Sequence, residues 1–142
     1  MNINARALLI AVAAALLAGT HAAAHHSFAA EFDGQKPFRV TGSLVKIEWT
    51  NPHIYFYLDA KDDAGGVIHW TFSAGSPGAL SRRGFKKGDL KLGDTVVVDG
   101  YLARDGSHFM DARRVMLPDG RIVSVASAGD GGPGAETQAP AR

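Results

Sequence analysis

The sequence predicts a small all-β domain, and three observations support this prediction. Residues 37–125 form short runs rich in β-branched and aromatic residues, separated by Gly, Pro, Asn and Asp. Within them, residues 53–60 alternate between apolar and polar side chains, as expected for a strand with one face in the core. A short helical signal separates the third run from the fourth. This order is typical of an OB-like β-barrel of five to six strands, with the helix between strands 3 and 4.

The first strand is expected to bend. Residues 38–49 are rich in β-branched residues, and their apolar phase switches between Leu44 and Val45, close to Gly42. A switch of this kind is typical of a β-bulge or a sharp bend. Further strands are expected at residues 53–60, 67–73, 91–102, 109–117 and 121–125. An open β-sandwich is the alternative fold, although roughly 90 residues is small for one.

The helical signal lies at residues 75–84. Ser76 can cap a helix whose first position is Pro77, and Gly84 suits its end. The alternation in the flanking strands then indicates which side chains face the interior. The predicted core consists of Val40, Leu44, Ile54, Phe56, Leu58, Ile68, Trp70, Phe72, Val96, Val98 and Leu102.

The chain begins with the three parts of a secretory signal peptide. A short region with one positive charge, Arg6, precedes twelve apolar residues at 7–18, and small residues follow. A membrane anchor would need about 20 apolar residues. We therefore expect residues 1–24 to be cleaved, no transmembrane anchor to remain, and the mature protein to be periplasmic or secreted. Residues 25–36 are expected to be a lead-in, and residues 126–142, rich in Gly and Ala, a disordered tail.

Composition excludes several functions. The chain has no cysteine, so disulfides, thiolate nucleophiles and thiolate metal sites are absent. After removal of the signal, basic and acidic residues are equal in number, which argues against a nucleic-acid partner. No serine lies in a nucleophile motif, no carboxylates are paired for acid–base catalysis, and no zinc-hydrolase spacing occurs. An enzyme is therefore not the favoured interpretation.

Histidine is the residue type that most suggests chemistry. Cleavage after Ala24 leaves His25 and His26 at the new N-terminus. An N-terminal histidine can chelate a cation through its α-amine and its ring, and a near-planar set of nitrogen donors suits Cu(II). Cleavage one or two residues earlier places a histidine third from the amine, which also favours square-planar Cu(II) or Ni(II). The alternative is that a flexible terminus binds copper only adventitiously.

A third histidine, His53, follows an Asn-Pro turn at the start of the second predicted strand. It shares a face with Tyr55 and Tyr57, and it is expected to lie beside His69 or Thr71 of the next strand. These side chains suggest a platform for a metal or a small ligand, because the second and third strands of an OB-like barrel commonly bind ligands. An ordinary solvent-exposed strand is the alternative interpretation of the tyrosines.

A compact basic cluster follows the expected helix and consists of Arg82, Arg83, Lys86 and Lys87. It can receive an anionic head group or the carboxylates of a protein partner, although such clusters are usually a solvated surface. The tyrosines and this cluster would also suit single-stranded nucleic acid. Export and a neutral mature chain argue against that partner.

Five motifs occur in the order seen in one bacterial family. They are residues 25–28 (HHSF), 48–53 (EWTNPH), 75–84 (beginning GSP), 90–94 (LKLGD) and 117–121 (LPDGR). With these motifs the sequence, from about residue 25 to residue 125, resembles domain-of-unknown-function family 6152. The resemblance implies a small exported protein and assigns no activity. It also implies that the paired histidines and His53 belong to one recurrent set of motifs.

The function expected from these observations is binding by an exported protein whose natural ligand is unknown. The expected ligands of a copper ion are His25, His26 and His53. The residues expected to face a small ligand are Tyr55, Tyr57 and His69. A non-catalytic structural or accessory role in an envelope complex is the alternative, with the basic cluster and a sheet edge as the contact surface. A copper-dependent oxidative enzyme built on the same histidines is a third interpretation.

Overall fold

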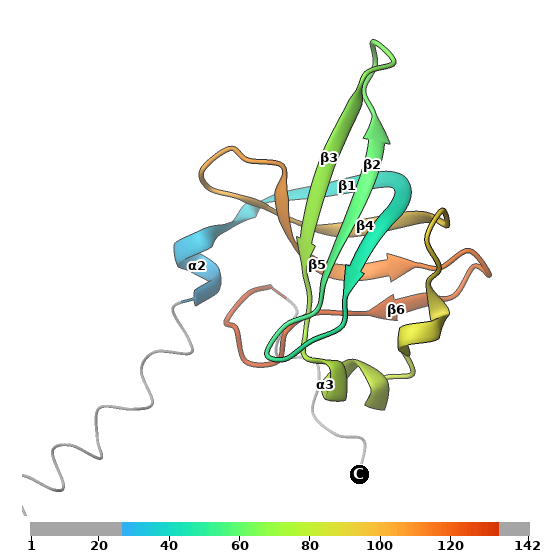
Figure 1. Cartoon of the computed structure of the whole chain (residues 1–142). Coiled ribbons are helices and arrows are strands. Elements are labelled where there is room, and N and C mark those ends of the chain that lie inside the picture. Colours follow the sequence, from blue (N-terminus) through green and yellow to red (C-terminus); the bar gives the residue numbers. More distant parts are fainter. Residues whose placement is uncertain (1–26, 134–142) are drawn as a thin grey trace, which may run out of the picture.

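Figure 1 shows the computed structural model of the chain, which describes residues 27–133. Within this range the fold is all-β, as predicted, because six strands dominate and the helices are short. The signal peptide expected at residues 1–24 lies outside the described residues. The same holds for His25, His26 and residues 134–142.

The elements follow one another in the predicted order. They are the helix α2 (Ser27–Glu31), the strands β1 (Phe32–Glu48), β2 (Tyr55–Lys61) and β3 (Val67–Ser73), the helix α3 (Pro77–Arg82), the short 3-10 helix η1 (Lys87–Asp89), and the strands β4 (Thr95–Ala103), β5 (Phe109–Met116) and β6 (Ile122–Ser124). The helix α3 therefore lies between β3 and β4, where the sequence predicts it.

The strands pair in a cycle. The long strand β1 pairs antiparallel with β4 through residues 37–43 and with β2 through residues 43–48. Antiparallel pairing also joins β2 to β3 and β4 to β5. The strands β3 and β5 run parallel and pair over residues 71–73 and 109–111. Each of these five strands therefore has at least two neighbours, and β6 pairs with the far end of β5.

The bend in β1 depends on two positions. The pairing with β2 shifts register between Leu44 and Lys46, so Val45 is the extra residue of a bulge and its side chain is exposed. This confirms the predicted phase switch. At Gly42, a Cβ atom would lie 2.7 Å from the carbonyl oxygen of Asp59, so the two backbones approach more closely than a side chain permits. Together these positions let β1 bend, so that one part of it pairs with β4 and the other part with β2.

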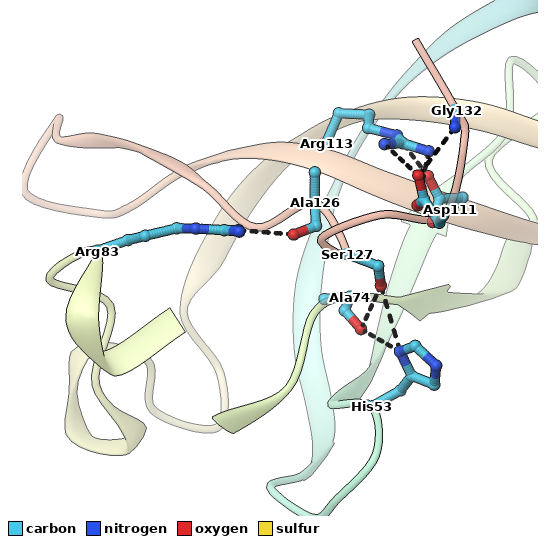
Figure 2. Close-up of polar contacts among 9 residues, drawn as sticks. His53, Ala74, Arg83, Asp111, Arg113, Ala126, Ser127 and Gly132 are labelled. Carbon is cyan, nitrogen blue, oxygen red and sulfur yellow. Dashed lines mark hydrogen bonds and ion pairs between the residues drawn. The ribbon is translucent and has the colours of Figure 1, made fainter. Parts of the chain in front are cut away.

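Local sequence explains the helix α3. The Ser76 hydroxyl caps it by accepting a hydrogen bond from the amide of Ala79 at 3.4 Å. Leu80 of this helix is fully buried in the core. Arg83, which follows the helix, donates from Nη1 to the carbonyl oxygen of Ala126 at 2.6 Å (Figure 2). Arg83, a member of the predicted basic cluster, therefore makes a contact that stabilises the fold.

One hydrophobic core joins the strands and α3, and nine of the eleven predicted core side chains are buried in it. The exceptions, Ile68 and Leu102, are only partly buried. Ile68 lies on the half of β3 that extends past β5, in the hairpin that projects from the sheet in Figure 1. Leu102 follows a register shift between Asp99 and Gly100, which changes the alternation along β4. The buried side chains that the prediction omitted include Leu80, Phe85, Met110, Val115 and Val125.

A second, smaller cluster docks the expected lead-in onto the domain. Phe28 of α2 and Phe32 of β1 are buried together with Ala103, and Phe32 packs on Phe109 with ring centroids 5.1 Å apart. Phe32 is also paired with Ala103, so β1 begins several residues before its predicted start. The docked phenylalanines therefore hold part of residues 27–36 beside β4.

The packed chain continues past residue 125, where the sequence places the end of the domain. Ala126 and Ser127 are buried, Asp130 is half-buried, and Gly132 is buried. Part of the segment after residue 125 therefore lies against the domain. These small and polar residues pack through hydrogen bonds and ion pairs, which an apolar pattern in the sequence does not reveal.

Replacing Trp70 by alanine should lower the free energy of unfolding by roughly 3–5 kcal/mol, as expected for a large aromatic side chain removed from a core. Trp70 is 7% exposed, and its ring stacks on Phe38 and Phe72 at centroid distances of 5.5 and 6.3 Å. Denaturant unfolding measures the change. The control is Ile122→Ala at a side chain that is exposed, and it should cost less than about 0.5 kcal/mol. A loss below about 1 kcal/mol at Trp70 would contradict its place in the core.

Candidate functional site

His53 lies in the turn between β1 and β2, next to the end of β3. Two backbone hydrogen bonds hold the turn there: the Ile54 amide donates to the Gly75 oxygen at 3.1 Å, and the Ala74 amide donates to the Ile54 oxygen at 2.9 Å. The peptide bond between Asn51 and its following proline is cis. The His53 side chain is half-buried, and its Nδ1 lies 3.0 Å from the carbonyl oxygen of Ala74 (Figure 2). Backbone contacts therefore fix both the turn and the ring.

The contacts of Nδ1 also fix the tautomer of His53. A carbonyl oxygen can only accept, so Nδ1 carries the proton in its contact with Ala74. The Ser127 hydroxyl lies 3.2 Å from Nδ1 and donates to the same carbonyl oxygen at 3.3 Å. In the neutral ring the lone pair is then on Nε2. Histidines that bind metals commonly have this arrangement, in which the other ring N–H donates to a carbonyl or a carboxylate.

A buried charge cluster lies on the neighbouring part of β5, where Asp111 pairs with Ser73 at the end of β3. Asp111 and Arg113 are 3% and 8% exposed. Nε of Arg113 lies 2.5 Å from Oδ2 of Asp111, and its Nη2 lies 3.0 Å from Oδ2 of Asp130. The other oxygen of Asp130 accepts a hydrogen bond from the Gly132 amide at 2.9 Å. One guanidinium is therefore held between two carboxylates.

Burial dominates the electrostatics of Asp111. Loss of hydration raises the pKa of its carboxyl to about 7, against the opposing effect of Arg113 and with a smaller contribution from Asp130. Although Nε of Arg113 and Oδ2 of Asp111 are close, neither atom makes a hydrogen bond of good geometry within the described part of the chain. The cluster thus combines a carboxyl of raised pKa with a buried guanidinium that contacts it.

Arg113 also contacts the beginning of the described chain. The ring of Phe28 lies 4.7 Å from the Cζ atom of Arg113, within the range of a cation–π interaction. Gly132 leaves room for the guanidinium, because a Cβ atom at that position would overlap with Nη2 of Arg113. The helix α2, the strand β5 and residues 125–133, which we call the C-terminal loop, therefore meet at this side chain.

Sequence reasoning missed most of these residues. The available signal for Asp111 and Arg113 was their spacing of two positions, which puts both on one face of a predicted strand. Ser127 and Asp130 lie in a segment whose composition is typical of disorder, so no pattern distinguished them.

Tyr55 and Tyr57 of β2 line one open hollow of about 300 Å³. The other lining residues are Glu48, Thr71 and Phe109. The Tyr57 hydroxyl donates to Oε2 of Glu48 at 3.0 Å. Nζ of Lys46 lies 2.5 Å from Oε1 of Glu48 and 4.9 Å from the centre of the Tyr57 ring. The hollow therefore has aromatic walls, while its carboxylate, Glu48, is already paired with Lys46.

His69 does not line that hollow, because the register of β2 and β3 puts it opposite Asp59. Its Nδ1 lies 2.6 Å from Oδ1 of Asp59, and the imidazole is exposed. Thr71 faces Tyr57 across the strand pair. The expectation that His53 lies beside His69 or Thr71 on the sheet is therefore wrong. The reason is that β2 begins two residues after His53, which leaves His53 in the turn.

Among residues 27–133, no three His, Cys, Asp or Glu side chains are grouped so that they could hold a metal ion. Of the predicted metal ligands, His53 is the one that falls in this range. The helices in the same range are too short or too polar to cross a membrane.

The sequence as a whole matches one known family. The model of a family of unknown function, DUF6152, matches residues 13–110, which is more than half of the chain. The chain belongs to this family. The resemblance inferred from the motifs is thereby confirmed. A comparison of this DUF6152 protein with curated proteins gives no match.

Replacing Asp111 by asparagine tests the raised pKa in this DUF6152 protein. Because the pKa of about 7 in the folded protein exceeds the ordinary value of 3.8, the folded state binds more protons than the unfolded chain between these pH values. Relative to Asp111→Asn, the free energy of unfolding should therefore fall as pH rises from about 4 to about 7, by up to roughly 4 kcal/mol. Urea unfolding at several pH values measures this difference.

The control for this experiment is Asp119→Asn. Hydrogen bonds from Arg121 lower the pKa of this exposed carboxyl, so its variant should show no such fall in the same pH window. A difference between wild type and Asp111→Asn that stays constant over the window would mean that Asp111 is hydrated in the folded protein.

Proposed function

We propose that this DUF6152 protein is an exported binding domain that holds Cu(II) between the N-terminus of its mature chain and His53. The observation that carries the proposal is the half-buried ring of His53, whose Nδ1 contacts the Ala74 oxygen and whose Nε2 is left as the donor. The three-part leader at residues 1–24 supports export. The cycle of strand pairings, with α3 before β4, supports an OB-type barrel.

The contacts of α2 support the participation of the N-terminus. Phe28 contacts Arg113, which also binds the C-terminal loop. Ser127 of that loop contacts His53. His25 precedes Phe28 by three residues, and three residues of extended chain span roughly 10 Å. The N-terminal donors are therefore close in sequence to Phe28, and Phe28 is linked through Arg113 to the C-terminal loop that contacts His53.

The donor chemistry favours copper. The α-amine and the ring of His25 supply two nitrogen donors, and Nε2 of His53 or the ring of His26 supplies another. Cu(II) prefers nitrogen donors in a near-planar array. The chain contains no cysteine, so soft thiolate donors are not available to draw in other metals. A copper-dependent oxidation would use the same nitrogen atoms, and oxygen consumption in the presence of a reductant tests that role.

Mature protein that begins at His25 should bind Cu(II) near neutral pH. Acetylation of the N-terminal α-amine, or the substitution His53→Ala, should each weaken binding about tenfold or more, because each removes a nitrogen donor. Competition with a chromophoric chelator of known affinity measures these changes. Affinity should also fall below about pH 6.5, where free imidazole takes up a proton that coordination has to displace.

Two further variants sharpen this comparison. His69→Ala is the matched control, since this imidazole is exposed and is bound to Asp59, and it should leave copper affinity unchanged. Ser127→Ala removes a contact of Nδ1 without removing a donor, so it should weaken binding less than His53→Ala does. The site is not the one proposed if the acetylated N-terminus and His53→Ala both leave the affinity unchanged.

A second candidate is a non-catalytic accessory role in an envelope complex. Its support is an exposed apolar pair, Met116 and Ile122, which lie opposite each other on β5 and β6. Three members of the basic cluster also remain exposed: Arg82, Lys86 and Lys87. Mature protein that is purified mildly without copper, and that does not take up added Cu(II), would favour this role over the first.

A further inference from the structure

A groove lies over β1, β4 and β5, on residues that take no part in the proposed copper site. Its volume is about 630 Å³, which is within the usual range for small-molecule sites. Some of the residues that line the groove lie at two places where the strand pairing is irregular. The strand β1 rejoins β4 at Pro37, and β4 shifts register against β5 between Asp99 and Gly100. These irregular positions leave a hollow where a regular sheet would present a continuous surface of side chains.

Three charged side chains form a row across these strands. Arg39 of β1 is paired with Asp99 of β4, and Asp99 is paired with Arg114 of β5. Arg39 donates to both oxygens of Asp99, from Nε at 2.6 Å and from Nη2 at 2.9 Å. Nη2 of Arg114 donates to Oδ2 of the same carboxylate at 3.2 Å. Because two guanidiniums share one carboxylate, the row carries one uncompensated positive charge.

The row has the means to bind a second carboxylate. The side chains of Arg39 and Arg114 are 63% and 62% exposed, so their outer N–H groups are accessible from the groove. A guanidinium has five N–H donors in a planar fork that matches a carboxylate, and Asp99 already shows this mode of binding in the row. Arg113 also lines the groove, but its guanidinium is already paired with the carboxylates of Asp111 and Asp130.

Apolar side chains supply much of the remaining lining. They are Pro37, Phe38, Tyr101, Ala126 and Pro133. Pro37 is exposed and Tyr101 is half-buried. Covering such side chains with the body of a ligand would remove apolar surface from water, which is favourable. The lining therefore suits an anion with an apolar body better than a small inorganic anion.

We propose that this groove binds a small monocarboxylate with an aromatic or hydrocarbon body, whose carboxylate is held by Arg39 and Arg114 beside Asp99. The single uncompensated charge of the row matches a monoanion, and the apolar lining matches the body. The proposal is independent of copper binding, and it can be tested on metal-free protein.

Benzoate and its neutral counterpart benzamide are the probes, in an NMR titration of metal-free mature protein. We expect benzoate to bind with a dissociation constant of about 1 mM or below, and at least about fivefold more tightly than benzamide, since only the carboxylate is attracted by charge. Arg39→Gln and Arg114→Gln should each weaken benzoate binding about fivefold or more. Asp99→Asn should strengthen it, because the internal competitor for the two guanidiniums then loses its charge.

Matched controls separate this site from a general effect of charge. Arg82→Gln, at the end of α3, and Asp119→Asn, in the turn before β6, make the same charge changes outside the groove. Both should leave benzoate affinity within about twofold of wild type. Circular dichroism and denaturant unfolding show whether each variant is folded. The proposal is overturned if benzoate causes no shifts up to about 20 mM, if benzamide binds equally well, if Asp99→Asn weakens binding, or if the controls act like the groove variants.

Discussion

The guanidinium of Arg113 fastens three parts of the described chain that are distant in the sequence. It lies on β5 with Asp111, it binds Asp130 of the C-terminal loop, and it contacts Phe28 of α2. Removing one partner from a buried ion pair costs about 3–5 kcal/mol, because the remaining charge is left in an apolar interior. The buried guanidinium of Arg113 is costly without its partners, so its contacts with them help to hold the C-terminal loop and α2 against the sheet.

The position of His53 depends on the same arrangement. Ser127 belongs to the loop that Arg113 holds, and its hydroxyl contacts both Nδ1 of His53 and the Ala74 oxygen. If the loop left the sheet, the ring would keep a single partner and would gain freedom to rotate. A fixed ring lowers the entropic cost of binding a ligand, as for any preorganised group. The buried ion pairs and the candidate metal ligand are thus parts of one packed region.

Local charge distinguishes the two candidate binding surfaces, although residues 25–142 contain equal numbers of basic and acidic residues. The surface at His53 offers an imidazole nitrogen, a donor type that suits a metal cation. The groove over β1, β4 and β5 offers two guanidiniums around one carboxylate, which suits an anion. Net charge averages over both surfaces, so it gives no information about either site.

The sequence by itself determined the strands, the capped helix, most of the core and the bulge at Val45, because alternation, capping and phase switches are properties of neighbouring residues. It also identified His53 as a residue of interest. The partners of that histidine were decided only by the tertiary structure, since Ser127 is 74 positions away. The same holds for Arg113 and Asp130, which are 17 positions apart. Local patterns carry no record of such distances, and buried ion pairs form wherever the folded backbone brings opposite charges together out of water.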